Sequence, residues 1–189
     1  MKKTEPIRDK KALRQLAVYW LKRGNFRNYA LIVLGVSTAL RIGDLLSLTW
    51  SDVYDEERRA FRSHIFLKER KTGKKKQIPL SKKAVKALWR YYPHRSGDFI
   101  FANNRKSAGA ICREHAWRII RAATEALGLA FSVGCHGLRK SFGFFAWKAG
   151  VLPVLLMELF NHSSFEITRL YLGITQAEMD RVYLGMALF

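Results

Sequence analysis

The sequence has few acidic residues, few cysteines and no long hydrophobic run. Its 15 Asp and Glu stand against 34 Lys and Arg, so the formal net charge of the 189 residues is +19. Two cysteines, Cys112 and Cys135, exclude a disulfide framework and fit a reducing compartment. The longest apolar run, residues 29–40, contains two hydroxyl residues and is too short to cross a bilayer.

The excess of basic residues points to a polyanionic partner. Residues 1–80 carry a net charge of +11 and residues 81–189 one of +8, so the charge is spread along the chain and is not a basic tail. Such a surface binds nucleic acid by releasing counterions, and we expect double-stranded DNA as the partner. A membrane surface would need a basic amphipathic helix, and none is evident. Without a segment of signal-peptide type, the predicted location is cytoplasmic and nucleoid-associated.

Hydrophobic periodicity and turn residues predict an α+β domain that is mostly α-helical, with a small antiparallel sheet near residues 60–80. Its two strands, residues 62–69 and 75–80, are joined by a turn at Thr72 and Gly73. Helices are expected at residues 9–22, 26–40, 42–48, 82–92, 108–127, 136–149, 153–160 and 175–186, and a short strand at 99–101.

Four residues in the last third of the chain carry the chemistry. His136 and Arg139 are three residues apart, and His162 and Tyr171 follow. Two imidazoles and a guanidinium can hold a phosphate and stabilise the charge that develops on it, and a tyrosine hydroxyl beside them is a plausible nucleophile. Together with the net charge, these groups indicate covalent chemistry on DNA.

These residues lie in motifs that resemble the catalytic domain of the tyrosine recombinase (phage integrase) family, over about residues 9–174. Four motifs appear in the family's order. ALRIGDLLSL at 39–48 resembles its first-arginine box, and RKTGK at 70–74 with IPL at 78–80 resembles its lysine hairpin. HGLR at 136–139 resembles its His-x-x-Arg box, and NHSS at 161–164 with Thr168 and Tyr171 resembles its His…Tyr box. The chain departs from the family at Asn161, where glycine is usual, and at Lys140, where histidine is frequent. Asparagine is the best substitute for glycine in a left-handed backbone.

The resemblance implies a catalytic set of Arg41, Lys71, His136, Arg139, His162 and Tyr171. The two arginines would bind the non-bridging phosphate oxygens, and His162 would add a hydrogen bond. His136 would donate to the phosphate or accept the proton of Tyr171. Lys71, with Lys74 as the alternative, would protonate the leaving 5′-oxygen.

Tyr171 would thereby form a 3′-phosphotyrosyl link, with no metal and no cofactor. Asp44, about one helical turn past Arg41, would orient that arginine or His136. DNA contacts are expected from six basic residues: Lys68, Arg70, Lys74, Lys75, Lys76 and Lys140.

Other interpretations of single residues remain open. Tyr183 also follows both histidines and rivals Tyr171 as the nucleophile. Cys112, His115, Cys135 and His136 could suggest zinc but include no Cys-x-x-Cys pair. The whole chain could be an inactive DNA-binding protein of the same fold, or a relaxing enzyme of the type IB topoisomerase kind.

The predicted organisation is a catalytic domain at residues 1–172 and a tail helix within 173–189. That tail carries little charge, and it would pack either on its own domain or on a neighbouring protomer in a synaptic tetramer. We expect no separate N-terminal core-binding domain, so the chain would be a minimal member or a fragment. The sequence does not distinguish integration from excision or inversion, or reveal whether a mobile element is involved.

Overall fold

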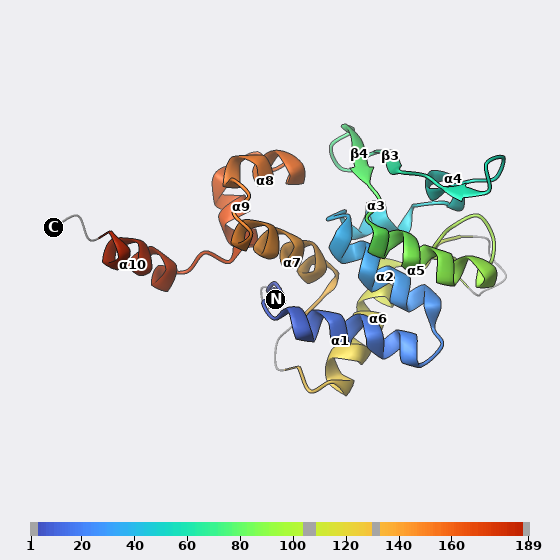
Figure 1. Cartoon of the computed structure of the whole chain (residues 1–189), viewed down its shortest axis with the longest axis horizontal. Helices are drawn as coiled ribbons and strands as arrows, with labels where there is room; N and C mark the ends of the chain where they lie inside the picture. The colour runs from blue at the N-terminus through green and yellow to red at the C-terminus, as the bar shows by residue number, and fades with distance from the viewer. Residues whose placement is uncertain (1–3, 104–108, 130–132, 187–189) are drawn as a thin grey trace.

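A computed structural model describes residues 4–103, 109–129 and 133–186 of the chain, and this part is mostly helical (Figure 1). The helices are α1 (Lys10–Lys22), α2 (Phe26–Ser37), α3 (Ile42–Leu46), α4 (Trp50–Val53), α5 (Lys82–Tyr91), α6 (Arg113–Ala126), α7 (Cys135–Lys148), α8 (Pro153–Phe160), α9 (Phe165–Leu172) and α10 (Gln176–Gly185), with a 3₁₀ turn at Tyr92–His94. Two antiparallel pairs of strands complete it: β1 (Tyr54–Asp55) with β2 (Ala60–Phe61), and β3 (His64–Lys68) with β4 (Lys75–Pro79). The predicted fold class is confirmed.

Helix α2 is the centre of the helical body. It lies between α1 and α5 in Figure 1 and also contacts α7. Leu31 and Leu34 pack toward α5, β3 and β4, whereas Ile32 packs toward α1 and α6. Because α2 is apolar around most of its circumference, it can join two hydrophobic clusters into one core.

The end of α2 positions the first arginine. The helix predicted to reach residue 40 stops at Ser37, and the buried Ala39 has a left-handed backbone with a φ of 53°. Alanine adopts this conformation at a cost of about 1–2 kcal/mol, which tertiary contacts must offset. The reversal places Arg41 at the N-cap of α3.

The β3–β4 hairpin carries the basic segment of the chain. Ile65 and Ile78 pair across the two strands and face the core. The turn between the strands closes on Glu69, whose N–H donates to the carbonyl of Lys74 at 2.9 Å and whose carbonyl accepts the N–H of Gly73 at 2.8 Å. The hairpin tip therefore has a defined backbone.

Two further predicted elements differ from the structure, and one pair of short strands was not predicted. Residues 99–101 form only an isolated bridge, between Thr49 and Phe99, and no strand. The helix predicted at 108–127 begins at Arg113, and residue 108 lies outside the described residues. The short β1–β2 pair was not predicted, because strands of two residues carry too little sequence pattern.

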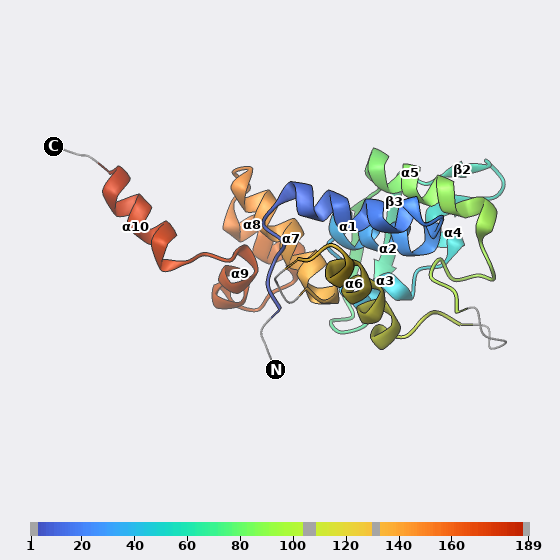
Figure 2. The same ribbon diagram turned by 90° about the horizontal axis from the view of Figure 1, so that it is seen from below.

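Helix α10 extends away from the rest of the molecule (Figures 1 and 2). None of its described residues is buried, and Val182, Tyr183 and Leu184 are exposed. An ion pair of 2.6 Å joins Glu178, in its first turn, to Lys148 of α7. Residues 187–189 of the predicted tail lie outside the described residues.

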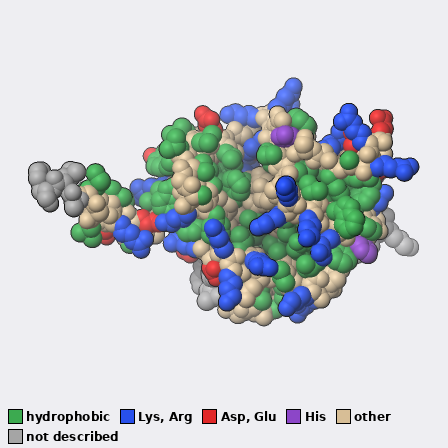
Figure 3. Space-filling view, in the orientation of Figure 1, with side chains coloured by type: hydrophobic (Ala, Val, Ile, Leu, Met, Phe, Trp, Pro, Cys, Tyr) green, Lys and Arg blue, Asp and Glu red, His purple; other side chains and the backbone are tan. Residues whose placement is uncertain are grey.

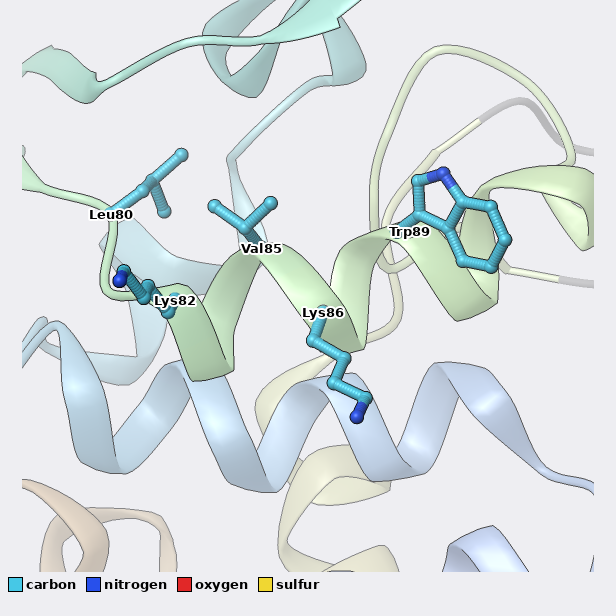
Figure 4. A pocket seen from close by; sticks show the side chains of 5 residues that line it. All are labelled: Leu80, Lys82, Val85, Lys86 and Trp89. Carbon is cyan, nitrogen blue, oxygen red and sulfur yellow. The ribbon is translucent and has the colours of Figure 1, made fainter.

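The surface carries many basic side chains. Figure 3 shows Lys and Arg distributed over one whole face, with few Asp and Glu among them. A shallow hollow on the outer side of α5 is lined by Leu80, Lys82, Val85, Lys86 and Trp89 (Figure 4), none of which is a predicted site residue. No helix in the described part of the chain is long and apolar enough to cross a membrane.

Candidate active site

Arg139 is the most deeply buried member of the predicted set. It lies one turn after His136 on α7 and is only 1% exposed. Its Nη1 donates to the carbonyl of Ala39 at 2.5 Å and its Nη2 to the carbonyl of Phe160 at 2.7 Å. Its Nε has no partner among the described residues. Because a buried N–H of a charged guanidinium is costly without an acceptor, this group favours an anionic ligand.

Arg41 meets Arg139 at one backbone oxygen. Its Nη2 donates to the same carbonyl of Phe160 at 3.3 Å, and its side chain remains 21% exposed. The two guanidinium groups, 98 residues apart in sequence, thus converge beside the C-terminal end of α8. Two like charges held this close favour a negatively charged ligand between them.

Tyr171 and His136 are hydrogen bonded. The hydroxyl of Tyr171, on α9, lies 2.5 Å from Nε2 of His136, and the tyrosine is 8% exposed. Burial, followed by the charges of Lys140, Arg139 and Arg41, lowers the pKa of His136 to about 4. The imidazole is therefore neutral near pH 7, and Nε2 can accept the phenolic proton. Burial raises the pKa of Tyr171, while the charge of Arg139 opposes that rise.

His162 completes the group around the tyrosine. Its ring centroid is 4.4 Å from that of Tyr171, and its Nδ1 is 2.9 Å from the hydroxyl oxygen of Thr168. Burial, then the charges of Arg139 and Arg41, lowers the pKa of His162 to about 4. Its buried Nε2 has no partner within the described residues, so a second unsatisfied nitrogen lies in the site.

Asn161 has the left-handed backbone that its sequence position suggested. It caps the C-terminus of α8 with φ 50° and ψ 51°, and the N–H of His162 then donates to the carbonyl of Met157 at 3.0 Å. This is a helix-ending geometry that glycine usually supplies. The departure from the family's motif therefore leaves the loop geometry intact.

Lys71 does not lie with the two arginines, the two histidines and Tyr171. It lies in the exposed turn of the β3–β4 hairpin, and its ammonium forms no hydrogen bond or ion pair with any described residue.

The carboxylate of Asp44 forms no hydrogen bond with Arg41 or His136. Instead it is buried and accepts the backbone N–H of Arg70 at 3.0 Å, so Asp44 holds the hairpin.

The six residues predicted to bind DNA fall into two groups. Lys68, Arg70, Lys74 and Lys75 are exposed on the hairpin. Lys76 and Lys140 are directed inward: Lys76 contacts Glu69 and the carbonyl of Leu159, and Lys140 donates to the carbonyl of Thr4. The sequence could not separate the groups, because all six are lysine or arginine near basic neighbours.

The alternative residues lie elsewhere. Tyr183 is 81% exposed on α10, away from the histidines. Cys112 is exposed at the start of α6, and within the described residues no three His, Cys, Asp or Glu side chains gather as a metal site.

Sequence reasoning missed Glu69, whose buried carboxylate contacts Arg41. The signal available for it was a single acid within the basic run at residues 68–76.

Fold and site together define a helical domain built to act on a phosphodiester, and comparison with known proteins identifies its family. The family model for the phage integrase family matches residues 9–178. The chain belongs to this family, that of the tyrosine recombinases.

Similar proteins agree with this assignment. The chain is 32% identical over 180 residues to "Probable integrase/recombinase YoeC" of Bacillus subtilis, covering 95% of this chain and 94% of that one. It is 30% identical over 171 residues to "Tyrosine recombinase XerD" of Mycobacterium leprae, covering 84% of this chain but only 52% of that protein.

Two solved structures share the fold. A crystal structure of XerA recombinase matches with a TM-score of 0.77 and 21% identity, over 99% of this chain and 67% of that one. XerH recombinase bound to its palindromic difH substrate, after cleavage, matches with a TM-score of 0.75 and 20% identity, over 97% and 53%.

Proposed function

We propose that the protein is a site-specific DNA recombinase that cleaves and rejoins DNA through a 3′-phosphotyrosyl intermediate on Tyr171. The observation that carries this proposal is the hydrogen bond between the Tyr171 hydroxyl and Nε2 of a neutral His136, beside two converging arginines. A nucleophile held by its base next to fixed positive charge is the arrangement that covalent catalysis at a phosphate needs.

In the first step the phenolic oxygen of Tyr171 attacks the scissile phosphorus, and His136 accepts the phenolic proton. A bond forms from phosphorus to the tyrosine, and the bond from phosphorus to the 5′-oxygen breaks. Lys71 supplies the proton for that leaving oxygen. The 5′-hydroxyl of a second strand then reverses the reaction, so the energy of the broken bond is conserved and no high-energy cofactor is consumed.

Charge on the phosphate would be stabilised by the two arginines and by a hydrogen bond from the neutral His162. The unpartnered Nε of Arg139 and Nε2 of His162 are available to non-bridging oxygens, and Arg41 is exposed enough to reach them. Removing one such donor is expected to slow cleavage by about 10²–10³-fold.

Double-stranded DNA is the proposed partner, and the net charge of +19 supports this choice. The XerH structure similar to this chain contains its difH DNA substrate. We place the protein in the cytoplasm, associated with the nucleoid, because that is where such a substrate would be found.

The tail helix is proposed to dock on a neighbouring protomer. α10 leaves its apolar side chains exposed, and the same chain exposes Leu152 at the N-cap of α8, Val154 and Leu155 on α8, and Phe165, Ile167 and Leu170 on α9. Apolar surfaces of this kind favour association, and a head-to-tail exchange of α10 around a ring would join four active sites in a synaptic tetramer. Residues 1–172 would then be the catalytic domain.

A nicked DNA substrate tests the proposed chemistry. The protein first selects its binding site from a random library, and a duplex of that site is nicked so that cleavage releases a short fragment and traps the adduct. Wild type should form a covalent complex that survives denaturation, whereas Tyr171→Phe should bind equally well and form none. Binding without an adduct in the wild type would favour the inactive DNA-binding protein.

A second assay addresses the remaining alternative. Relaxation of supercoiled DNA that lacks the selected site would favour an enzyme of the type IB topoisomerase kind. Strand exchange that requires two copies of the site would support the recombinase.

A further inference from the structure

Glu69 is a buried carboxylate at the border of the site. Its side chain is 0% exposed, and it receives four contacts. Arg41 Nη1 and Asn161 Nδ2 lie 2.7 and 2.8 Å from Oε2, Thr72 Oγ1 lies 2.8 Å from Oε2, and Lys76 Nζ lies 3.2 Å from Oε1. The partners come from the start of α3, from the hairpin and from the end of α8, so one carboxylate connects three elements.

This carboxylate is ionised at neutral pH. Burial alone would raise the pKa of Glu69, but hydrogen bonds from Asn161 and Thr72 and the charges of Lys76 and Arg41 outweigh it and lower the pKa to about 2. A buried anion with this many donors fixes their positions, because moving any one of them leaves charge unpaired.

The contacts hold Arg41 in one orientation. With Nη1 on Glu69 and Nη2 on the Phe160 carbonyl, the plane of the guanidinium is fixed at two points. Its remaining N–H groups stay available to a ligand, since Arg41 is 21% exposed. A preoriented arginine loses less entropy when it binds a phosphate.

Asn161 and Lys76 support the same arrangement from the other side. The amide of Asn161 reaches Glu69 from a left-handed C-cap, a contact that glycine at this position would lack. Lys76 also donates to the carbonyl of Leu159 at 2.5 Å and so joins β4 to α8.

Glu69 binds one of the two site arginines and leaves the other site residues alone. Within the described residues it forms no hydrogen bond with Arg139, His162 or Tyr171, and the Nε of Arg139 and the Nε2 of His162 remain unpartnered. The contact between Glu69 and Arg41 therefore does not use up these two nitrogens.

We propose that Glu69 is a positioning residue for DNA cleavage, which orients Arg41 toward the scissile phosphate. This role rests on the proposed recombinase function. Asn161, Lys76 and Thr72 bind the carboxylate of Glu69, and that carboxylate in turn orients Arg41.

The test compares Glu69→Gln with wild type on the nicked substrate, measuring the rate of adduct formation and the Kd for DNA separately. We expect the rate to fall by about 10–100-fold with Kd changed less than about threefold, because a misplaced group slows chemistry more than binding. Glu69→Asp should lie between the two. Glu158→Gln, an exposed carboxylate on α8, is the matched control and should match wild type.

The contrary results are distinct. Faster cleavage by Glu69→Gln would make the carboxylate an inhibitory latch, and an unchanged rate would make it purely structural; either result overturns the proposal. If the wild type forms no adduct, both the proposed recombinase function and the proposed role of Glu69 are wrong. If wild type and Glu69→Gln form the adduct at equal rates, only the role of Glu69 is wrong.

Two further variants keep the test decisive if Glu69→Gln folds poorly. Asn161→Gly removes only the amide and keeps the backbone conformation, and it should slow cleavage about 3–10-fold without loss of folding. In an Arg41→Ala background, Glu69→Gln should cost nothing further, since its effect passes through Arg41. Unchanged cleavage by Asn161→Gly, or a full additional loss in the Arg41→Ala background, would overturn the proposal.

Discussion

The protonation states of single residues decide how this site works. His136 is exposed to solvent, yet desolvation of its ring and then the charges of Lys140, Arg139 and Arg41 lower its pKa to about 4. A base must be neutral to accept a proton, so His136 can accept from Tyr171 wherever the pH exceeds that value. The lowered pKa keeps the His136 imidazole neutral across the physiological pH range, as the proposed role of general base requires.

The pH dependence of cleavage follows from this shift. Because kcat/KM reports the free enzyme, it should stay level from about pH 8 to 5 and decline only as the pH falls through about 4. Measuring the second-order rate of adduct formation across this range, with the Kd for DNA at each pH as the control, checks the expectation. A decline centred near 6.5 would show that His136 is not the base, or that its pKa is not lowered.

Lys71 can be tested as the general acid with a modified leaving group. Lys71→Ala should slow cleavage of ordinary DNA by about 10²–10⁴-fold, because the 5′-oxygen then leaves without a proton. A substrate with sulfur in place of that bridging oxygen needs no proton and should restore the rate. If the sulfur substrate restores the rate of Lys74→Ala and not that of Lys71→Ala, the general acid is Lys74. Lys75→Ala, which removes only a proposed DNA contact, should weaken binding of both substrates alike.

At the scale of elements, α7, α8 and α9 hold the site together. Gly143 of α7 packs directly on Phe160, whose carbonyl receives both arginines, and a Cβ at Gly143 would lie 2.9 Å from the Phe160 ring. The ring is fully buried and cannot move aside without displacing its backbone.

Gly143→Ala should therefore impair both stability and cleavage. Overpacking of this kind typically costs about 1–3 kcal/mol, measured here as the free energy of unfolding in urea. Gly185→Ala, at a helical position with nothing within 4 Å of the added Cβ, is the control and should not lose stability. Normal cleavage by Gly143→Ala would show that the carbonyl of Phe160 does not position the arginines.

The sequence predicted those features that residue identity and order determine. Arg41, His136, Arg139, His162 and Tyr171 were identified from three of the four motifs, and the structure gathers them around the end of α8. The left-handed turn at Ala39 was not predicted, because alanine favours helix and only tertiary contacts impose the reversal.

The burial of individual charges was equally inaccessible to sequence reasoning. Nothing in the sequence distinguishes Lys76 and Lys140 from the exposed basic residues, and only the packing of β4 and α7 directs them inward. Glu69 shows the same limit, since its four partners are 3 to 92 residues away along the chain.

At the scale of the whole molecule, α10 extends away from the helices that precede it (Figures 1 and 2). Among the described residues one ion pair, Lys148 with Glu178, connects it to α7, and such surface pairs contribute about 0–1 kcal/mol. Its exposed apolar side chains are the surface for the proposed contact with a second copy.

Deletion of residues 175–189 should leave the domain stable and prevent assembly. We expect the free energy of unfolding to change by no more than about 1 kcal/mol, because no described α10 residue is buried. Sedimentation with site DNA should show tetramers for the full chain and smaller complexes for the deletion variant. A loss of several kcal/mol would mean that the tail packs on its own domain.

The identity of the nucleophile is the central claim, and peptide mapping of the trapped adduct tests it most directly. Trypsin cuts after Arg169 and Arg181, so Tyr171 falls in the peptide 170–181 and Tyr183 in the peptide 182–189. After nuclease digestion, mass spectrometry should find the residual 3′-phosphonucleotide on the peptide 170–181, attached to Tyr171. A remnant on the peptide 182–189, or a protein that binds its site and never carries DNA, would contradict the mechanism.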